Sequence, residues 1–410
     1  MKLKSLLAAG AMSLVFAGLA NAAVNHVYIT GSTAFRNSIF STLDAAGQVF
    51  DATPTFTGYG NSTAAKCSYM IFSNNISGTP YIIKCEWSGS EAGILDCVSN
   101  TLETFPADSL LGAPGTSTAN ATPTTPPTVD SHATDLGFAD NNQAFSRTTK
   151  PSLTGSEVGV IPFTWVKNAQ LPAQQTTDWQ NWTNLTLEQL FVAIGNGGTP
   201  LSMFTGNQAD TNFVYVAGRN NNSGTRANAL LILGYPLATP VTQIYITGGA
   251  NDGSAAITWI VPNPDNEGQD SGGTLATTMT YCGSATQQDA NDPWVNAGLG
   301  GTGDDFGWYA VAYLGRSDAT SALTGHANNA VEMLFNGVAS TSSNIETGVY
   351  PFWGNEWLYQ SLNMGTGGST VYGKLVAKIP VSLDGTTGIP YSSMHVYKTS
   401  SASYPIEIGF

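Results

Sequence analysis

Three segments of this chain share one pattern, and that pattern constrains the fold more than any other feature. Each begins with a short apolar run typical of a strand, continues through a turn rich in glycine and serine, and ends in apolar residues at helical spacing. The turns cover residues 31–36, 87–93 and 218–226. Because α/β sheets gather such strand ends at one crevice, the pattern predicts an α/β fold in which the three turns meet.

The turn at 218–226 has the most specific chemistry. It brings Arg219 to the end of a strand, and Ser223, Gly224 and Thr225 then open a helix. Unpaired backbone N–H groups, hydroxyl donors and a guanidinium at one point are typical of sites that hold a tetrahedral oxyanion. A single turn of this kind is also typical of an N-capped surface helix, so the prediction depends on the three turns together.

Four segments, taken in chain order, resemble the ligand loops of the phosphate-binding proteins of phosphate ABC transporters, within the type II periplasmic-binding superfamily. Residues 31–35 resemble the first anion loop of that family, and residues 88–93 resemble its second, Ser-Gly-rich loop. Residues 136–140 resemble its Gly-x-x-Asp segment, and residues 219–225 resemble its Arg-x-x-x-Ser-Gly-Thr loop. The similarity runs over residues 24–359 and fades toward the C-terminus.

The resemblance implies an α/β protein of two lobes joined by two crossovers, the type II periplasmic-binding-protein fold. A signal peptide is expected over residues 1–22 and the first part of lobe I over residues 23–165. Lobe II is expected over residues 166–346, and the second part of lobe I, with an atypical C-terminal tail, over residues 347–410.

The resemblance also implies a ligand and the residues that bind it. We expect inorganic phosphate or a similar oxyanion, captured between the lobes for uptake through an ABC transporter permease. The protein is then a monomeric binding protein rather than an enzyme, without cofactor or metal. The expected contacts are backbone N–H groups in the first loop and mainly side chains in the others: Thr33, Ala34, Phe35, Ser90, Asp140, Arg219, Asn221, Ser223, Gly224 and Thr225.

One of these positions departs from the family. Asn221 stands where well-known members have an aspartate. An ionised carboxylate only accepts hydrogen bonds, so it favours a protonated phosphate oxygen and repels sulfate, whereas an asparagine NH₂ can donate to a bare oxygen. Asn221 therefore predicts a narrower preference for phosphate over sulfate. The alternative is that Asn221 only shapes the loop, because asparagine tolerates left-handed backbone conformations.

The N-terminal segment and the net charge limit where the protein can be located and which partners it can have. Lys2 and Lys4, an apolar core over residues 6–19 and an Ala-Asn-Ala cleavage site over residues 20–22 are typical of a secretory signal peptide. No later segment is long enough to span a membrane. The net charge of −14 argues against nucleic acid or an anionic membrane as a partner. We therefore expect a periplasmic or secreted protein without a lipid anchor.

The four cysteines form no metal-binding pattern, and an even number in an exported chain favours disulfides. Cys67 and Cys85 flank two strand-like runs around a turn at residues 74–78. A hairpin would place the two cysteines nearly opposite each other, which predicts a Cys67–Cys85 disulfide. A Cys97–Cys282 disulfide follows by elimination.

Other segments give local predictions. Residues 112–131 lack periodicity and are interpreted as a surface loop, and residues 157–166 are a near-continuous apolar strand suited to the first crossover. Residues 186–189 form a capping box that opens a helix. Residues 263–293 are interpreted as a long loop with one strand near residues 277–282, and the tail after Met364 as a short helix and a strand over residues 394–398.

The sequence gives less support to two other classes of function, an enzyme and a sugar-binding protein. The four histidines have no metal spacing and the chain has no GxSxG or SxxK motif, which argues against an enzyme. Trp179 and Trp182 are candidates for stacking on a sugar, but a role in the core or on a lobe surface is favoured. The alternative that remains open is an exported structural or adhesive protein that keeps the binding-protein fold without transport.

Overall fold

The computed structural model describes most of the chain after the expected signal peptide. The described residues are 23–168, 176–196, 198–210, 213–237, 241, 243, 245–247, 258–260, 268–280, 309–325, 329–399 and 406–407. The expected signal peptide and Cys282 lie outside these residues.

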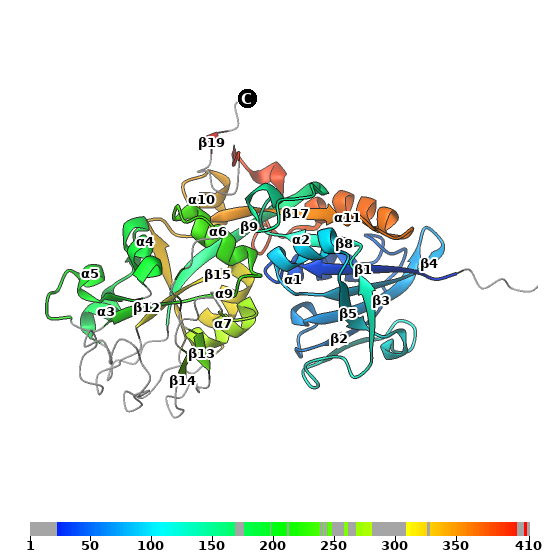
Figure 1. Cartoon of the computed structure of the whole chain (residues 1–410), viewed down its shortest axis with the longest axis horizontal. Helices are drawn as coiled ribbons and strands as arrows, with labels where there is room; N and C mark the ends of the chain where they lie inside the picture. The colour runs from blue at the N-terminus through cyan, green and yellow to red at the C-terminus, as the bar shows by residue number, and fades with distance from the viewer. Residues whose placement is uncertain are drawn as a thin grey trace, which may run out of the picture.

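One strand links the two halves of the molecule. A sheet runs through it in the order β11-β12-β15-β9-β17-β8-β1-β4-β3-β2-β6. The first part of β9 (Thr154–Lys167) pairs with β17 (Trp353–Gln360), and its last part pairs with β15 (Ala310–Gly315) and β16 (Val331–Phe335). Figure 1 shows a lobe on each side of this strand. The predicted α/β class with two lobes is confirmed, while the exact domain boundaries stay a prediction.

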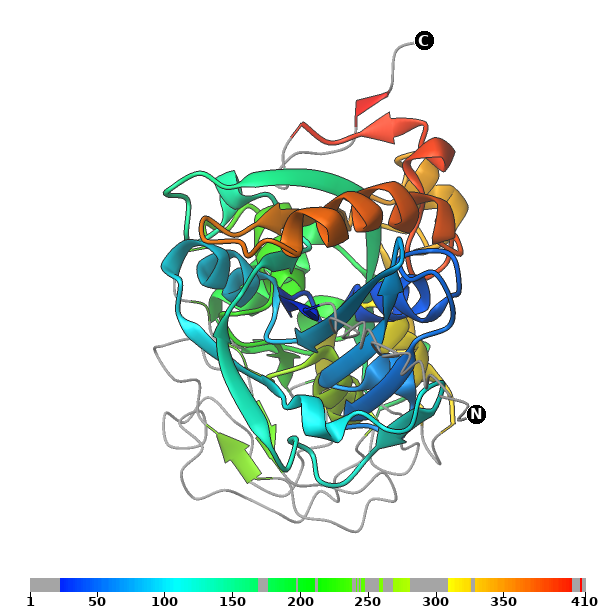
Figure 2. The same ribbon diagram turned by 90° about the vertical axis from the view of Figure 1, so that its right-hand side faces the viewer.

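The first lobe uses strands and helices from both ends of the chain. Parallel pairing of β1 with β4 and with β8 forms its centre, and β17 adds to β8 in the antiparallel direction. Figure 2 shows α11 lying along one side of this lobe, where it contacts α1, β9 and β17. The helices and strands of this lobe, with β17, are β1 (Asn25–Gly31), α1 (Arg36–Asp44), β2 (Thr55–Tyr59), β3 (Tyr69–Ile76), β4 (Thr79–Glu86), α2 (Ser90–Ser99), β5 (Leu102–Pro106), β6 (Ser117–Asn120), β7 (Val129–Ala133), β8 (Leu136–Ala139) and α11 (Gly368–Ser382).

The second lobe comes mainly from the middle of the chain. Its elements are α3 (Thr177–Asn181), β10 (Asn184–Leu185), α4 (Leu187–Asn196), β11 (Gly198–Pro200), α5 (Ser202–Thr205), β12 (Phe213–Ala217), α6 (Gly224–Ile232), β13 (Tyr245–Thr247), β14 (Thr258–Ile260), α7 (Gly272–Met279), α9 (Arg316–Leu323) and α10 (Ser342–Glu346). Short 3₁₀ turns (Ala64–Lys66, Asp108–Leu110, Gln143–Phe145, Tyr391–Ser393) and the strands β18 (Val396–Tyr397) and β19 (Ile406–Glu407) complete the described chain. No helix within these residues is both long and apolar enough to cross a membrane.

Several local predictions are confirmed. The capping box at α4 forms in both directions: Gln189 N donates to Thr186 Oγ1 at 3.2 Å, and Thr186 N donates to Gln189 Oε1 at 3.0 Å. Trp179 is fully buried and packs against Trp182 and Tyr309, which is the core role favoured over sugar stacking.

Three local predictions are wrong. The segment at 112–131 is not a loop throughout, because β6 pairs with β2 and β7 pairs with β5. Residues 277–279 belong to helix α7 rather than to a strand. The tail contains the 15-residue helix α11, longer than expected, which buries Val371, Leu375 and Ile379 against the first lobe. A long C-terminal helix removes one reason for considering the tail atypical.

The predicted Cys67–Cys85 disulfide is wrong, and Cys67, Cys85 and Cys97 are all buried free thiols. The cause is the register of the β3–β4 hairpin. Its tight turn has Ser77 and Gly78 at positive φ, and this places Met70, not Cys67, opposite Cys85. The predicted Cys97–Cys282 disulfide involves Cys282, which lies outside the described residues, and Cys97 itself is a buried free thiol.

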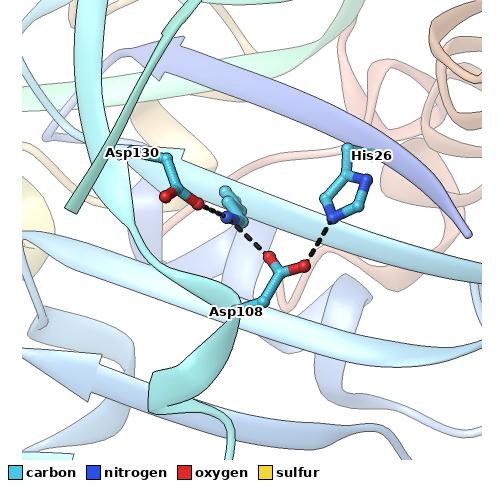
Figure 3. A network of polar contacts seen from close by, with 4 residues as sticks. His26, Asp108 and Asp130 are labelled. Carbon is cyan, nitrogen blue, oxygen red and sulfur yellow. Dashed lines mark hydrogen bonds and ion pairs between the residues drawn. The ribbon is translucent and has the colours of Figure 1, made fainter. Parts of the chain in front are cut away.

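A buried lysine attaches the paired strands β5 and β7 to the central sheet of the first lobe (Figure 3). Lys84 Nζ lies 2.7 Å from Asp108 Oδ1 and 2.5 Å from Asp130 Oδ2, and His26 Nε2 lies 2.8 Å from Asp108 Oδ2. The Lys84 side chain is fully buried, whereas the two aspartates are partly exposed. Burial by itself raises the pKa of Asp108, but the hydrogen bonds from Lys84 and His26 outweigh it and lower that pKa.

We expect Lys84→Met to destabilise the fold moderately. The methionine fills the space of the lysine stem, but both carboxylates lose their buried partner and must rely on solvent. The free energy of unfolding should fall by roughly 1–3 kcal/mol. Urea unfolding of both proteins measures it, and a change below about 0.5 kcal/mol would mean that the pair adds no net stability.

Candidate oxyanion-binding site

The three predicted turns meet where helices α1, α2 and α6 begin. Gly31 has φ +121°, and a Cβ there would collide with Phe138 O at the end of β8, so this approach requires glycine. Gly89, with φ +107°, makes an equally close approach to Asn222 O. Glu91 N, in the first turn of α2, donates to Asn222 O at 2.9 Å. The helix N-termini of the three turns therefore lie side by side, as the sequence pattern predicts.

Asp140, which follows β8, lies at the centre of this junction and is 1% exposed. Ser32 Oγ donates to its Oδ1, and Thr225 Oγ1 donates to its Oδ2 at 3.4 Å. The backbone N of Asp140 donates to Ser90 Oγ at 3.1 Å, and Asn228 Nδ2 donates to its carbonyl at 3.0 Å. Asp140 thus contacts the other three segments that resemble the family loops: its carboxylate accepts from Ser32 and Thr225, and its backbone N donates to Ser90.

Arg219 completes the junction from the second lobe and is 1% exposed. Its Nε donates to Gln269 O at 3.0 Å, and its Nη2 donates to Asp270 O at 3.0 Å. The same Nη2 donates to Thr33 Oγ1 of the first lobe at 3.3 Å. Its backbone N donates to Tyr313 OH at 3.1 Å. The guanidinium is therefore held in a fixed orientation, with one contact across the two lobes.

The junction contains buried charges of both signs. Burial is the largest influence on each: it raises the pKa of Asp140 and of Asp318, and it lowers the pKa of Arg36 and of Arg219. Opposite charges act against burial in every case, because Asp318 faces both arginines and Arg219 also faces Asp140. This balance keeps a guanidinium charged in a region with little water.

The structure brings together nearly all of the predicted site residues. Gly224 lies so close to Ser90 that a Cβ would collide with Ser90 Oγ, and Ser223 Oγ caps α6 by accepting from Arg226 N at 3.1 Å. Asn221 is the exception: it is half-buried and lines a cavity of about 570 Å³ with Arg147 and apolar side chains. The predicted residues at the junction are all less than one-tenth exposed: Thr33, Ala34, Phe35, Ser90, Asp140, Arg219, Ser223, Gly224 and Thr225.

Four charged residues of the junction were not predicted. Arg36 and Arg226 directly follow two predicted loops, but a sequence does not show whether a helix side chain points inward, and both are buried. Asp318 lies in the first turn of α9 and Glu356 in β17, and both are buried as well. The only sequence signal for Glu356 is an acidic residue next to Trp357 in a strand rich in aromatic residues.

The donors and acceptors of the junction suit the binding of an anion. Among the residues that the structure describes, no group of three or more His, Cys, Asp and Glu side chains could hold a metal ion. Hydroxyl donors, a guanidinium and helix N-termini favour an anion, while Asp140 offers an acceptor. A carboxylate acceptor inside an anion site selects an anion that still has a proton to donate.

Comparisons with known proteins gave only distant likenesses. No protein-family model and no curated protein matches the chain. A candidate phosphate ABC transporter substrate-binding protein of Clostridium perfringens, solved with bound phosphate, has 15% identity over 86% of this chain and 93% of its own, with a TM-score of 0.43. An ABC-type phosphate transport receptor of Vibrio cholerae has 12% identity over the same shares, with a TM-score of 0.41.

A DING protein has 13% identity over 89% of this chain and 90% of its own, with a TM-score of 0.39. The solved structures thus include proteins of the kind that the four loops resemble. At TM-scores below 0.5 these likenesses do not decide the ligand of this chain.

Proposed function

We propose that this protein is an exported solute-binding protein that captures phosphate between its two lobes. One observation carries the proposal: four segments far apart in the sequence converge on Asp140 and Arg219, which are both 1% exposed. Contacts across the junction include Arg219 Nη2 to Thr33 Oγ1 at 3.3 Å and Thr225 Oγ1 to Asp140 Oδ2 at 3.4 Å. Each of these groups is of a type that binds a protonated tetrahedral oxyanion.

In this proposal, the side chains that form hydrogen bonds with one another in the junction form hydrogen bonds with the ligand instead when it binds. The hydroxyls of Ser32 and Thr225 and the guanidinium of Arg219 donate to phosphate oxygens, and Asp140 accepts a hydrogen bond from the protonated phosphate oxygen. Movement of one lobe relative to the other opens and closes the site about the β9 and β17 strands. The bound ion then passes to an ABC transporter permease, and the binding protein works as a monomer in the periplasm or outside the cell.

Isothermal titration with phosphate tests the proposal, with sulfate as the comparison ligand. We expect one phosphate per chain and a weaker response to sulfate, because sulfate has no proton for Asp140 at neutral pH. Absence of binding for both anions would favour the alternative, an exported structural or adhesive protein that keeps the fold.

Asn221→Asp is expected to widen the preference for phosphate over sulfate. The new carboxylate adds negative charge beside the junction, which disfavours fully ionised sulfate more than protonated phosphate, so sulfate binding should weaken more than phosphate binding. Because Asn221 is half-buried at the edge of the junction, we expect a change of roughly two- to tenfold in the affinity ratio. Competition titrations at pH 7 measure it, and an unchanged ratio would mean that Asn221 only shapes the loop.

A further inference from the structure

Glu356 is a buried carboxyl group for which the binding site as described has no use. It lies in β17, and the side chain is fully buried. No backbone N–H, amide or hydroxyl group in the described part of the chain donates a hydrogen bond to either Oε atom. A carboxylate in that position is very costly, because it loses its hydration and gains no donor in exchange. The position therefore requires an explanation in terms of its neighbours.

The register of the sheet places Glu356 beside Asp140. Trp357 pairs with Ala139 at the end of the antiparallel β17–β8 ladder, and Glu356 and Asp140 are the next residues beyond this pair on the two strands. The two carboxyl groups are in hydrogen-bonding contact. On the other side of β17, Glu356 pairs with Gly159 of β9, which has no side chain to offer a donor.

Two carboxyl groups can bond to each other only when one of them holds a proton. Asp140 already accepts from Ser32 and Thr225, both of which favour its ionised form. Glu356 has no such donors, and the charge of Asp140 opposes its ionisation. Among the described residues, the other titratable side chains that interact with Glu356 are Tyr359 and Tyr391, and neither is a cation. The proton therefore belongs on Glu356.

We infer that Glu356 is a protonated positioning residue that donates a hydrogen bond to Asp140 and so keeps this carboxylate an acceptor aimed at the bound oxyanion. The inference rests on the proposed function. The pair then has one negative charge instead of two, which limits repulsion of the anion. Burial and the neighbouring Asp140 raise the pKa of Glu356 well above its ordinary value, in agreement with this assignment.

Two variants distinguish the effect of the hydrogen bond that Glu356 donates from the effect of the volume that its side chain fills. Glu356→Gln keeps a neutral donor toward Asp140, whereas Glu356→Leu fills the same space without a donor. We expect Glu356→Gln to bind phosphate within about threefold of the wild-type affinity and Glu356→Leu to bind roughly tenfold more weakly. Glu188→Gln, at an exposed position of α4, is the matched control and should bind like the wild type.

Infrared difference spectroscopy at neutral pH tests the proton directly and independently of binding. Subtracting the Glu356→Gln spectrum from that of the wild type should leave the carbonyl band of a protonated carboxylic acid. The same subtraction with Glu188→Gln should leave carboxylate bands only. If the Glu356 difference contains only carboxylate bands, or if Glu356→Leu binds phosphate as tightly as the wild type, the inference is wrong.

The two claims fail in different ways. If the wild-type protein binds no phosphate, the proposed function is wrong, yet the infrared band still decides whether Glu356 holds a proton. If the wild type binds phosphate and the band is absent, the function stands and the role of Glu356 is overturned. Should Glu356→Leu not fold, Glu356→Gln and the infrared spectrum still decide the question.

Discussion

Arg219→Ala is expected to weaken phosphate binding by about two to three orders of magnitude, which corresponds to roughly 2–5 kcal/mol. Arg219 is the guanidinium of the junction that reaches across to Thr33 of the first lobe, and its other donors are fixed by Gln269 O and Asp270 O. Because the guanidinium is already held in a fixed orientation, little free energy is spent on ordering it when the anion binds. Removing this charge-assisted contact should therefore lower the affinity by nearly its full interaction energy.

Isothermal titration measures this loss, with two comparison variants. Arg219→Lys keeps the charge but loses the planar set of donors, and it should bind with intermediate affinity. Arg147→Ala removes an exposed arginine near the same loop and should bind within about threefold of the wild type. If Arg219→Ala folds, as judged by circular dichroism, and still binds within about threefold of the wild type, the anion site lies elsewhere.

Lys167→Met is expected to destabilise the second lobe by roughly 3–5 kcal/mol. Lys167 is fully buried at the end of β9, and its Nζ donates to Trp179 O at 2.6 Å, Gln180 O at 3.2 Å and Trp182 O at 2.6 Å. These carbonyls lie at the C-terminal end of α3, where a helix has unpaired acceptors and a cation is favourable. Methionine fills the space but leaves these acceptors without their donor.

The change is measured as the free energy of unfolding in urea, with Lys150→Met as the control. Lys150 is exposed, and its side chain donates a hydrogen bond to Ser152 Oγ on the surface. Its replacement should therefore change stability by less than about 0.5 kcal/mol. Equal stability of Lys167→Met and the control would mean that water satisfies the three carbonyls as well as the lysine does.

The sequence could predict the junctions because their signals are local. Gly31 and Gly89 are needed where two backbones touch, and Ser223 caps the helix that it begins. Such requirements act within a few residues of the chain, so they appear directly in the pattern of glycine, serine and apolar residues. The α/β class and the convergence of the turns follow from them.

The features that were missed depend on register and on distant parts of the chain. The predicted cysteine pairing was wrong because the turn between β3 and β4 sets a register in which Met70, and not Cys67, lies opposite Cys85. The spacing of the cysteines in the sequence does not reveal this register. The strands β6 and β7 form in a segment without periodicity because each adds to a strand already in place, β2 and β5. Glu356 becomes part of the site only because β17 returns beside β8, more than two hundred residues after it.

The central claim is that a protonated tetrahedral oxyanion binds between Asp140 and Arg219. Arsenate has the shape and proton of phosphate, and its arsenic atom gives an anomalous X-ray signal. A crystal of the wild-type protein grown with arsenate should show one dominant anomalous peak within hydrogen-bonding reach of Arg219, Ser90 and Thr225. A peak outside this junction, or no peak at an arsenate concentration that saturates binding in solution, would contradict the account.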